Sequence, residues 1–334
     1  MTRPAELRRL VTEWDLLLSS LQGAPAVPGQ GSESRTPVTI LAGFLGSGKT
    51  TMLRQLLQGG HGLKLAAVVN DVGAVNIDAA MVAQSGSDVI ELTNGCSCCS
   101  LGPELGRGID ALATQAEPPG GILVEASGIA DPAGIGAVVA GNAQVRLDGI
   151  ITVIDAVALH SWLDNPATAP LFRRQLDAAH LLALNKIDLV ESGGIEAATA
   201  RLAELAPGRP VIPVEQGRLD PDVALGAALH GARPEPMHRP HEAGRFASKR
   251  IPVTGPMARG RLAAFLDNPP AGLLRVKGFV ETLEDPGRQQ SVQAVGRMWR
   301  IEPVVAGGGG KPVENNLILI GLADQVETWG RLSL

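Results

Sequence analysis

The chain has 334 residues, enough for two domains that each bury a hydrophobic core, and a formal net charge of −5. Its basic residues are scattered, so the sequence lacks the basic surface that nucleic acid or anionic lipid requires, and we expect neither partner. No apolar run approaches the length of a membrane span, and Glu6, Glu13 and Asp15 interrupt any signal-peptide pattern. We therefore expect a cytoplasmic protein with no membrane partner.

Residues 1–36 combine the pattern of an amphipathic helix with that of a linker. Apolar residues recur at spacings of three and four between Pro4 and Leu21, which is the period of a helix with one apolar face. We favour packing of this helix on its own domain over a role as a partner or dimer helix. Residues 22–36 are rich in Gly, Pro and Ser and predict a flexible connection.

Residues 37–230 predict an α/β domain. Short apolar runs recur there without alternation, as is typical of strands buried on both faces of a parallel sheet, and helix-compatible stretches lie between several of them. We predict a parallel sheet with helices on both faces, and the motif GFLGSGKT at residues 43–50 within it indicates the fold class of a P-loop NTPase. The expected strands cover residues 38–42, 65–69, 89–92, 121–124, 149–154 and 180–184, with helices at residues 51–58 and 171–179 among those between them.

The pattern breaks around residues 219–243, which are rich in Pro, Gly, Arg and His, and we assign residues 231–245 to an interdomain linker. Residues 246–334 then predict a smaller α+β domain at the C-terminus. Its expected strands cover residues 246–253, 273–281, 291–301 and 317–320, and helical patterns cover residues 257–266 and begin again at Ala323.

Residues 43–50 read GFLGSGKT and match the phosphate-binding pattern G-x-x-x-x-G-K-[ST] between an expected strand and an expected helix. Backbone N–H groups of such a loop wrap phosphates, and the N-terminus of the following helix favours their negative charge. We expect Lys49 to reach the β and γ oxygens and the Thr50 hydroxyl to bind Mg²⁺. The expected nucleotide contacts in this segment are Gly43, Gly46, Ser47, Gly48, Lys49, Thr50 and Thr51.

Glu125 directly follows an expected buried strand, and Gly128 follows three residues later. An acid at that position beside a P-loop can hold the magnesium shell or its water, so we expect Thr50 and Glu125 to serve as magnesium ligands. The Gly128 N–H could then sense the γ-phosphate, which places Lys49, Glu125 and Gly128 in the catalytic group. The alternative is that Glu125 only caps the next helix.

Asn185-Lys186-Ile187-Asp188 follows another apolar strand and predicts recognition of guanine. Guanine presents two adjacent donors that one carboxylate can accept, whereas adenine would leave Asp188 unpaired. Lys186 would cover the base with its aliphatic stem, and Asn185 completes the motif. Residues 214–217, Val-Glu-Gln-Gly, are a candidate second loop over the base.

All three cysteines lie in one cluster, Cys96, Cys98 and Cys99. Three soft ligands suit zinc or another thiophilic transition metal, but a closed structural zinc site needs four, so the fourth position stays open for transfer. Asp71 is a candidate oxygen ligand, though it could equally hold magnesium or water. The alternative is that the thiols are unliganded or redox-active. His230, His238 and His241 could collect metal, but we favour incidental histidines of a solvated linker.

Taken together, these motifs resemble the CobW family of metal-handling P-loop GTPases, relatives of the nickel-insertion GTPases for urease and hydrogenase. The resemblance implies slow GTP hydrolysis, zinc or cobalt binding at the cysteine motif, and delivery to a client metalloprotein or cofactor pathway. It rests on GFLGSGKTT at 43–51, NDVGAVNID at 70–78, ELTNGCSCC at 91–99, EASGIADP at 125–132, NKID at 185–188 and RVKG at 275–278.

The favoured function is therefore a GTPase metallochaperone that uses GTP, Mg²⁺ and Zn²⁺, with homo-oligomerisation and the client left open. A zinc sensor or buffer that binds GTP only as a conformational ligand is the alternative, and nucleotide turnover distinguishes the two. A P-loop kinase is a third possibility, but it would need a preference for ATP, and Asp188 argues against that.

Overall fold

The computed structural model describes residues 35–58, 63–69, 88–92, 101–225, 246–296, 298–304 and 315–331. Several predicted features fall outside these ranges. They are the N-terminal helix and its linker, Asp71 with the rest of residues 70–78, the cysteines at 96, 98 and 99, and the linker histidines at 230, 238 and 241. Within the described ranges, every helix is too short or too polar to cross a bilayer.

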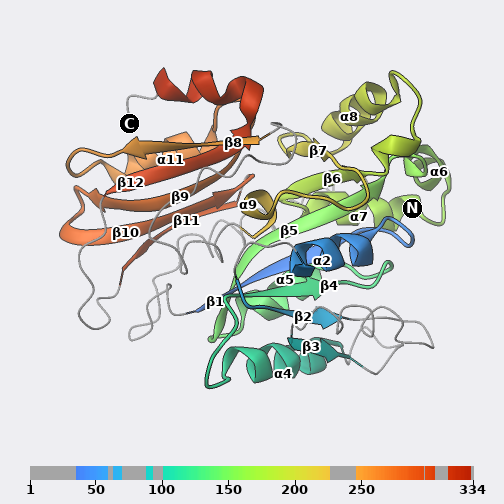
Figure 1. Ribbon diagram of the computed structural model, residues 1–334, viewed down its shortest axis with the longest axis horizontal. Coiled ribbons are helices and arrows are strands. Elements are labelled where there is room, and N and C mark those ends of the chain that lie inside the picture. The colour runs from blue at the N-terminus through green and yellow to red at the C-terminus, as the bar shows by residue number, and fades with distance from the viewer. Residues whose placement is uncertain are drawn as a thin grey trace, which may run out of the picture.

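The first sheet of the described residues has seven strands in the order β3-β2-β4-β1-β5-β6-β7, and all neighbouring strands are parallel (Figure 1). This architecture confirms the predicted fold class, with β7 as a strand that the apolar pattern did not reveal. The strands are β1 (Thr36–Ala42), β2 (Leu65–Val69), β3 (Asp88–Glu91), β4 (Gly121–Glu125), β5 (Val145–Asp155), β6 (Leu181–Asn185) and β7 (Val211–Pro213).

Helices cover both faces of this sheet, because side chains of consecutive strand residues point to opposite sides and both sides are apolar. On one face, Met52 and Leu53 of α2 belong to the same buried apolar cluster as Ile151 and Val153 of β5. The opposite face is covered by α4, α5, α7 and α8. The helices are α2 (Lys49–Gln58), α4 (Leu101–Ala113), α5 (Pro132–Ala140), α6 (Leu159–Asp164), α7 (Ala169–Ala178) and α8 (Gly194–Leu205).

The second sheet is antiparallel, with the order β11-β10-β9-β12-β8, and it confirms the smaller α+β domain. The prediction of one strand over residues 291–301 was wrong, because the run turns at Gly296, whose φ of 53° lies in the left-handed region. Its elements are β8 (Phe246–Pro252), α11 (Arg259–Asp267), β9 (Leu273–Thr282), β10 (Asp285–Val295), β11 (Met298–Pro303), β12 (Asn316–Leu322) and the 3₁₀ helix η4 (Ala323–Arg331).

The two sheets lie side by side, and α9 (Pro221–Ala224) lies between them (Figure 1). Leu274, Ile318 and Ile320 of the C-terminal sheet belong to the same buried apolar cluster as α2 and α9. The break in pattern that begins near Leu219 is therefore not the start of a solvated linker, because residues 219 and 223–225 are buried in that shared core.

Candidate functional site

The site lies at the carboxyl edge of the parallel sheet, beside its central strand. β1 pairs with β4 on one side and β5 on the other, and the chain leaves the end of β1 through the Gly-rich loop into α2. Strand order changes direction at this point, and open α/β sheets bind their ligands in the crevice that results. Glu125, Asp155 and Asn185 end the strands on either side, so the fold gathers them around the loop.

Glycine is required in the loop because the backbone adopts conformations that other residues avoid. The φ angles of Gly43, Gly46 and Gly48 are 134°, 73° and 99°. A Cβ atom on Gly43 would lie 2.1 Å from the carbonyl oxygen of Val153, and one on Gly48 would lie 2.3 Å from Nδ2 of Asn185. The loop is thus packed tightly against β5 and β6 and is left open at Gly46, where a Cβ would meet nothing within 4 Å.

The polar side chains of the loop fit a phosphate and a divalent cation. The Thr50 hydroxyl donates to Oε1 of Glu125 over 2.6 Å, and Nζ of Lys49 donates to the carbonyl oxygen of Phe44 over 3.2 Å. The hydroxyl of Ser47 is buried, and among the described residues it has no hydrogen-bond partner. A buried hydroxyl such as that of Ser47 is expected to bind a ligand. The Thr50 hydroxyl and the Glu125 carboxylate provide oxygen ligands of the kind that Mg²⁺ prefers.

Glu125 does not cap the helix that follows it, so the alternative from the sequence is wrong. The N-cap of α5 is Asp131, whose side chain accepts a hydrogen bond from the backbone N–H of Ala133 over 3.0 Å. Glu125 lies 6 % exposed at the end of β4 and is held by Thr50 instead. Its carboxylate is therefore directed at the loop.

Gly128 lies directly against the Gly-rich loop. A Cβ atom at this position would come within 2.8 Å of the backbone nitrogen of Leu45. The buried side chain of Gln175, on α7, donates to the carbonyl oxygens of Gly128 and Ala130 over 3.1 and 3.2 Å. Gln175 was missed in the sequence, although a polar residue on the core-facing side of an amphipathic helix is a usable signal.

Asn185 joins three segments of the site. Its Nδ2 donates to the carbonyl oxygen of Ser47 over 2.9 Å, and its Oδ1 accepts from the backbone N–H of Gly217 over 3.0 Å. It is 2 % exposed, so both bonds are shielded from water. The expected base-recognition motif, the phosphate loop and the expected second loop thus converge on one amide side chain.

Lys186 is held in a conformation that few residues other than glycine adopt, with φ 62° and ψ 33°. Its Nζ donates to Oδ2 of Asp155 over 2.7 Å. The other oxygen of Asp155 accepts from the backbone N–H groups of Val157 and Ala158, at 2.9 and 3.2 Å. Asp155 therefore caps the turn after β5 and also anchors Lys186, a contact between distant segments that the sequence did not show.

Asp188 is exposed at the rim of the site, on the 3₁₀ turn η2 (Ile187–Leu189), so its carboxylate is accessible to a ligand. Phe44 of the Gly-rich loop packs on Trp162 of α6 with ring centroids 5.2 Å apart. Trp162 packs in turn on the buried Phe172, with centroids 5.4 Å apart. The loop therefore rests on an aromatic stack that joins it to the core of the domain.

The predicted metal site cannot be placed on this geometry. The three cysteines and Asp71 lie outside the described residues. Within the described ranges, no group of three or more His, Cys, Asp or Glu side chains could hold a metal ion. β3, which precedes the cysteines in the sequence, ends at the same carboxyl edge of the sheet as β1, the strand before the Gly-rich loop.

Comparisons with known proteins agree with this geometry. Residues 37–213 match the model of the CobW/HypB/UreG nucleotide-binding domain, and residues 246–328 match the cobalamin synthesis protein CobW C-terminal domain. A zinc chaperone CobW of Sinorhizobium sp. is 29% identical over 356 residues, covering 91% of this chain and 97% of its own length.

Two further relatives extend the comparison. A zinc-regulated GTPase metalloprotein activator 1 of Schizosaccharomyces pombe is 30% identical over 194 residues. That match covers 55% of this chain, which spans 47% of the length of the yeast protein. The crystal structure of Zn(II)-bound YjiA GTPase from E. coli aligns with 88% of this chain and 97% of its own, at 23% identity and a TM-score of 0.43.

Proposed function

The chain belongs to the CobW/HypB/UreG family of nucleotide-binding domains and carries a CobW C-terminal domain, and from this premise we propose that it is a GTP-controlled metallochaperone. It is a P-loop GTPase, and relatives of both similar length and greater length are named as zinc chaperones or zinc-regulated GTPases. Zinc, or a related transition metal, is the cargo, and a client metalloprotein is the recipient.

The observation that carries the nucleotide part is the position of Asn185, which ties the phosphate loop to the expected base loop through two buried hydrogen bonds. Asp188 would accept the two donors of guanine, and Lys186, fixed by Asp155, would lay its stem along the base. A site that pairs both guanine donors rejects adenine, because adenine would leave the carboxylate of Asp188 without those two hydrogen bonds.

The Gly-rich loop and the residues at the end of β4 would carry out phosphate binding and hydrolysis. Backbone N–H groups of residues 43–51 would hold the phosphates, and Lys49 would offset the charge that develops on them. Thr50 and Glu125 would hold Mg²⁺, which supplies Lewis-acid stabilisation of the phosphoryl group when it is bound. Gly128, whose backbone lies against Leu45, would respond to the γ-phosphate.

Cys96, Cys98 and Cys99 would bind the cargo as thiolates, with Asp71 as a candidate oxygen ligand. Three thiolates leave one tetrahedral position of zinc for a client ligand, so the metal can pass on by ligand exchange. The support for coupling to the nucleotide is topological. β3 precedes the cysteines in the sequence and β4 precedes Gly128, and both strands end at the same edge of the sheet as β1, the strand before the phosphate loop.

A zinc sensor or buffer that does not transfer metal is the second candidate, because the same cysteines and the same GTP site would serve it. The two functions differ in what hydrolysis accomplishes. A metallochaperone needs GTP turnover to reset its metal affinity, whereas a sensor or buffer uses GTP only as a conformational ligand and needs no turnover.

The experiment is a competitive zinc titration with a chromophoric chelator, in the presence of Mg²⁺ and either GDP or a non-hydrolysable GTP analogue. We expect the two zinc affinities to differ by roughly 5- to 150-fold, the usual range of coupling between two sites. Glu125→Ala is expected to reduce that difference, and Glu204→Ala, an exposed carboxylate on α8, is the matched control. Equal zinc affinities in both states would exclude nucleotide-controlled transfer.

A further inference from the structure

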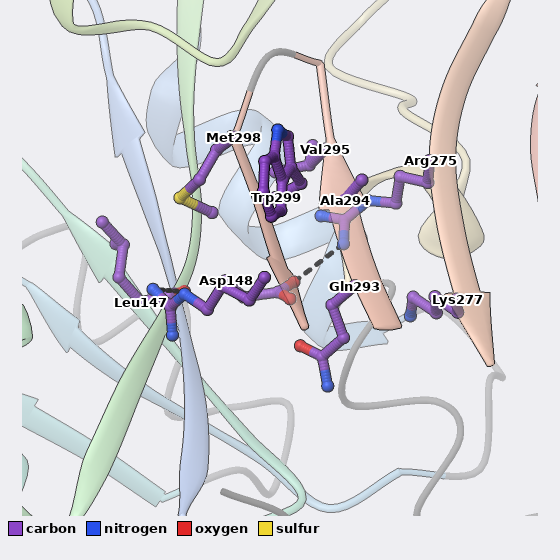
Figure 2. Close-up of a pocket in the computed structure, with 10 residues that line it drawn as sticks. Leu147, Asp148, Arg275, Lys277, Gln293, Ala294, Val295, Met298 and Trp299 are labelled. Carbon is purple, nitrogen blue, oxygen red and sulfur yellow. Dashed lines mark hydrogen bonds and ion pairs between the residues drawn. The ribbon is translucent and has the colours of Figure 1, made fainter. Parts of the chain in front are cut away.

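The interface between the two domains contains a buried arginine that binds the GTPase domain at three points. Arg275 on β9 is 2 % exposed. Its Nη1 donates to Oδ2 of Asp148 over 2.9 Å, its Nη2 donates to the carbonyl oxygen of Ala224 over 2.9 Å, and its Nε donates to the carbonyl oxygen of Val223. Figure 2 shows Arg275 and Asp148 facing one another across the interface. Through Arg275, the C-terminal domain is therefore hydrogen-bonded to both β5 and α9.

The two carbonyl groups belong to the last residues of α9, which is a single turn. The final carbonyls of a helix have no partner within it, and Arg275 donates hydrogen bonds to two of them. From inside the GTPase domain, the Thr39 hydroxyl on β1 donates to the Ala224 carbonyl over 3.3 Å.

α9 lies immediately after the expected base loop. Three residues separate it from Gly217, and the backbone N–H of Leu219 bonds the carbonyl oxygen of Gly217 over 3.0 Å. Gly217 donates to Asn185 and is packed so closely on α2 that a Cβ atom there would lie 2.7 Å from the backbone nitrogen of Met52. A shift of α9 would therefore displace residues 214–217 and disturb the hydrogen bond between Gly217 and Asn185, because Gly217 is packed too closely on α2 to move independently.

The ion pair that fixes Arg275 is itself buried and charged. Burial alone would raise the pKa of Asp148, but Arg275, Lys277 and Arg146 outweigh it and lower that pKa to about 2. Asp148, Arg275, Lys277 and Gln293 also line a small cavity of about 10 Å³ between the domains, large enough for about one water molecule. Arg275 is consequently locked in one conformation by charge and by packing.

We propose that Arg275 is a positioning residue for guanine-nucleotide binding, which acts from the C-terminal domain through α9 on residues 214–217. The C-terminal domain thus completes the base side of the nucleotide site without touching the nucleotide. By reciprocity, a guanine nucleotide strengthens the contact between the domains by the same factor. The inference rests on the proposed assignment of Asn185 and Asp188 to the base.

The test compares Arg275→Lys with Arg300→Lys in the full chain. A lysine at position 275 keeps a charge beside Asp148 but loses the fork that reaches both carbonyls of α9. Arg300 on β11 is the matched control, because its Nη2 also crosses the domain interface, to the carbonyl oxygen of Leu147 over 2.8 Å, without touching α9. The measurements are the equilibrium affinities for fluorescent GDP and for ATP, and the rate of GDP dissociation.

We expect Arg275→Lys to weaken GDP binding at least about fivefold through faster dissociation and to narrow the preference for guanine over adenine nucleotides. Arg300→Lys is expected to change the GDP affinity and the preference for guanine nucleotides by less than about twofold each. General loosening of the interface would weaken the binding of GDP and of ATP equally, and the ratio of the two affinities would not change. Equal effects of the two substitutions would overturn the inference. A wild-type protein with no guanine preference would instead overturn the proposed base assignment.

A second variant keeps the test decisive if Arg275→Lys does not fold. Thr39→Val removes the other donor to the Ala224 carbonyl from the side of the GTPase domain, with no change of charge. Thr39→Val is expected to weaken GDP binding, by a smaller factor than Arg275→Lys does. Unchanged GDP affinity in a folded Thr39→Val protein would show that α9 does not influence the base side, and the proposal would fail.

Discussion

His180 makes the GTPase domain sensitive to acid. This residue precedes β6, and its Nδ1 accepts a hydrogen bond from the backbone N–H of Ile150 over 2.9 Å, so the ring is neutral with its proton on Nε2. Burial, with smaller contributions from Arg209, Arg300 and Arg275, lowers the pKa of His180 to about 3. Protonation would place a charge in the core and remove the acceptor for Ile150.

The sign and size of the effect follow from the two pKa values of His180. An unfolded histidine has a pKa of about 6.5, so between about pH 6.5 and 3 the unfolded chain binds a proton that the folded chain does not. Stability from this residue is complete above that window and is lost as the pH falls through it. Between pH 7 and 5 the loss amounts to about 2 kcal/mol of unfolding free energy.

The assay is urea unfolding of the nucleotide-free chain at pH 7 and pH 5, followed by circular dichroism. His180→Asn keeps an acceptor for Ile150 but does not titrate, so its unfolding free energy is expected to fall by about 2 kcal/mol less than that of the wild type. The same substitution at the exposed His160 controls for the loss of a histidine. Equal losses in wild type and His180→Asn would refute the reasoning.

Three further outcomes are expected. Asp188→Ala should abolish most of the preference for GTP over ATP, and equal binding of the two nucleotides by the wild type would contradict the guanine assignment. Cys98→Ser should weaken zinc binding with an unchanged circular dichroism spectrum; unfolding on chelation would point to a structural zinc site instead. Gly278→Ala should destabilise the C-terminal domain by roughly 1–3 kcal/mol, because the new Cβ would lie 1.9 Å from the carbonyl oxygen of Asn316, and a melting temperature like that of the wild type would argue against that clash.

Features fixed by local pattern were predictable from the sequence. The strands of the parallel sheet are buried on both faces, and such strands produce uninterrupted apolar runs. Four of the predicted runs therefore match β1, β2, β4 and β6 to within two residues at each end, and a fifth lies within the longer β5. β7 was missed because it has only three residues, Val211–Pro213, and ends in proline. The single run over residues 291–301 concealed a hairpin, because a tight turn needs only one glycine, Gly296.

Features that depend on contacts between distant segments were not predictable. The pair of Lys186 with Asp155 spans 31 residues, and the pair of Arg275 with Asp148 spans 127. In each case one member has an adequate local explanation, as a turn cap for Asp155 or as part of a family motif for Arg275. A single sequence carries no sign of which distant charge a buried residue meets, because that depends on strand order and register.

The apolar cluster shared by the two sheets has a thermodynamic consequence. Leu274, Ile318 and Ile320 lose their covering if the GTPase domain unfolds, and Leu225 and the other buried residues of the α9 segment lose theirs if the C-terminal sheet separates. Neither domain can melt without exposing apolar surface of the other, so each domain stabilises the other against unfolding. A substitution that weakens one sheet therefore lowers the melting temperature of both.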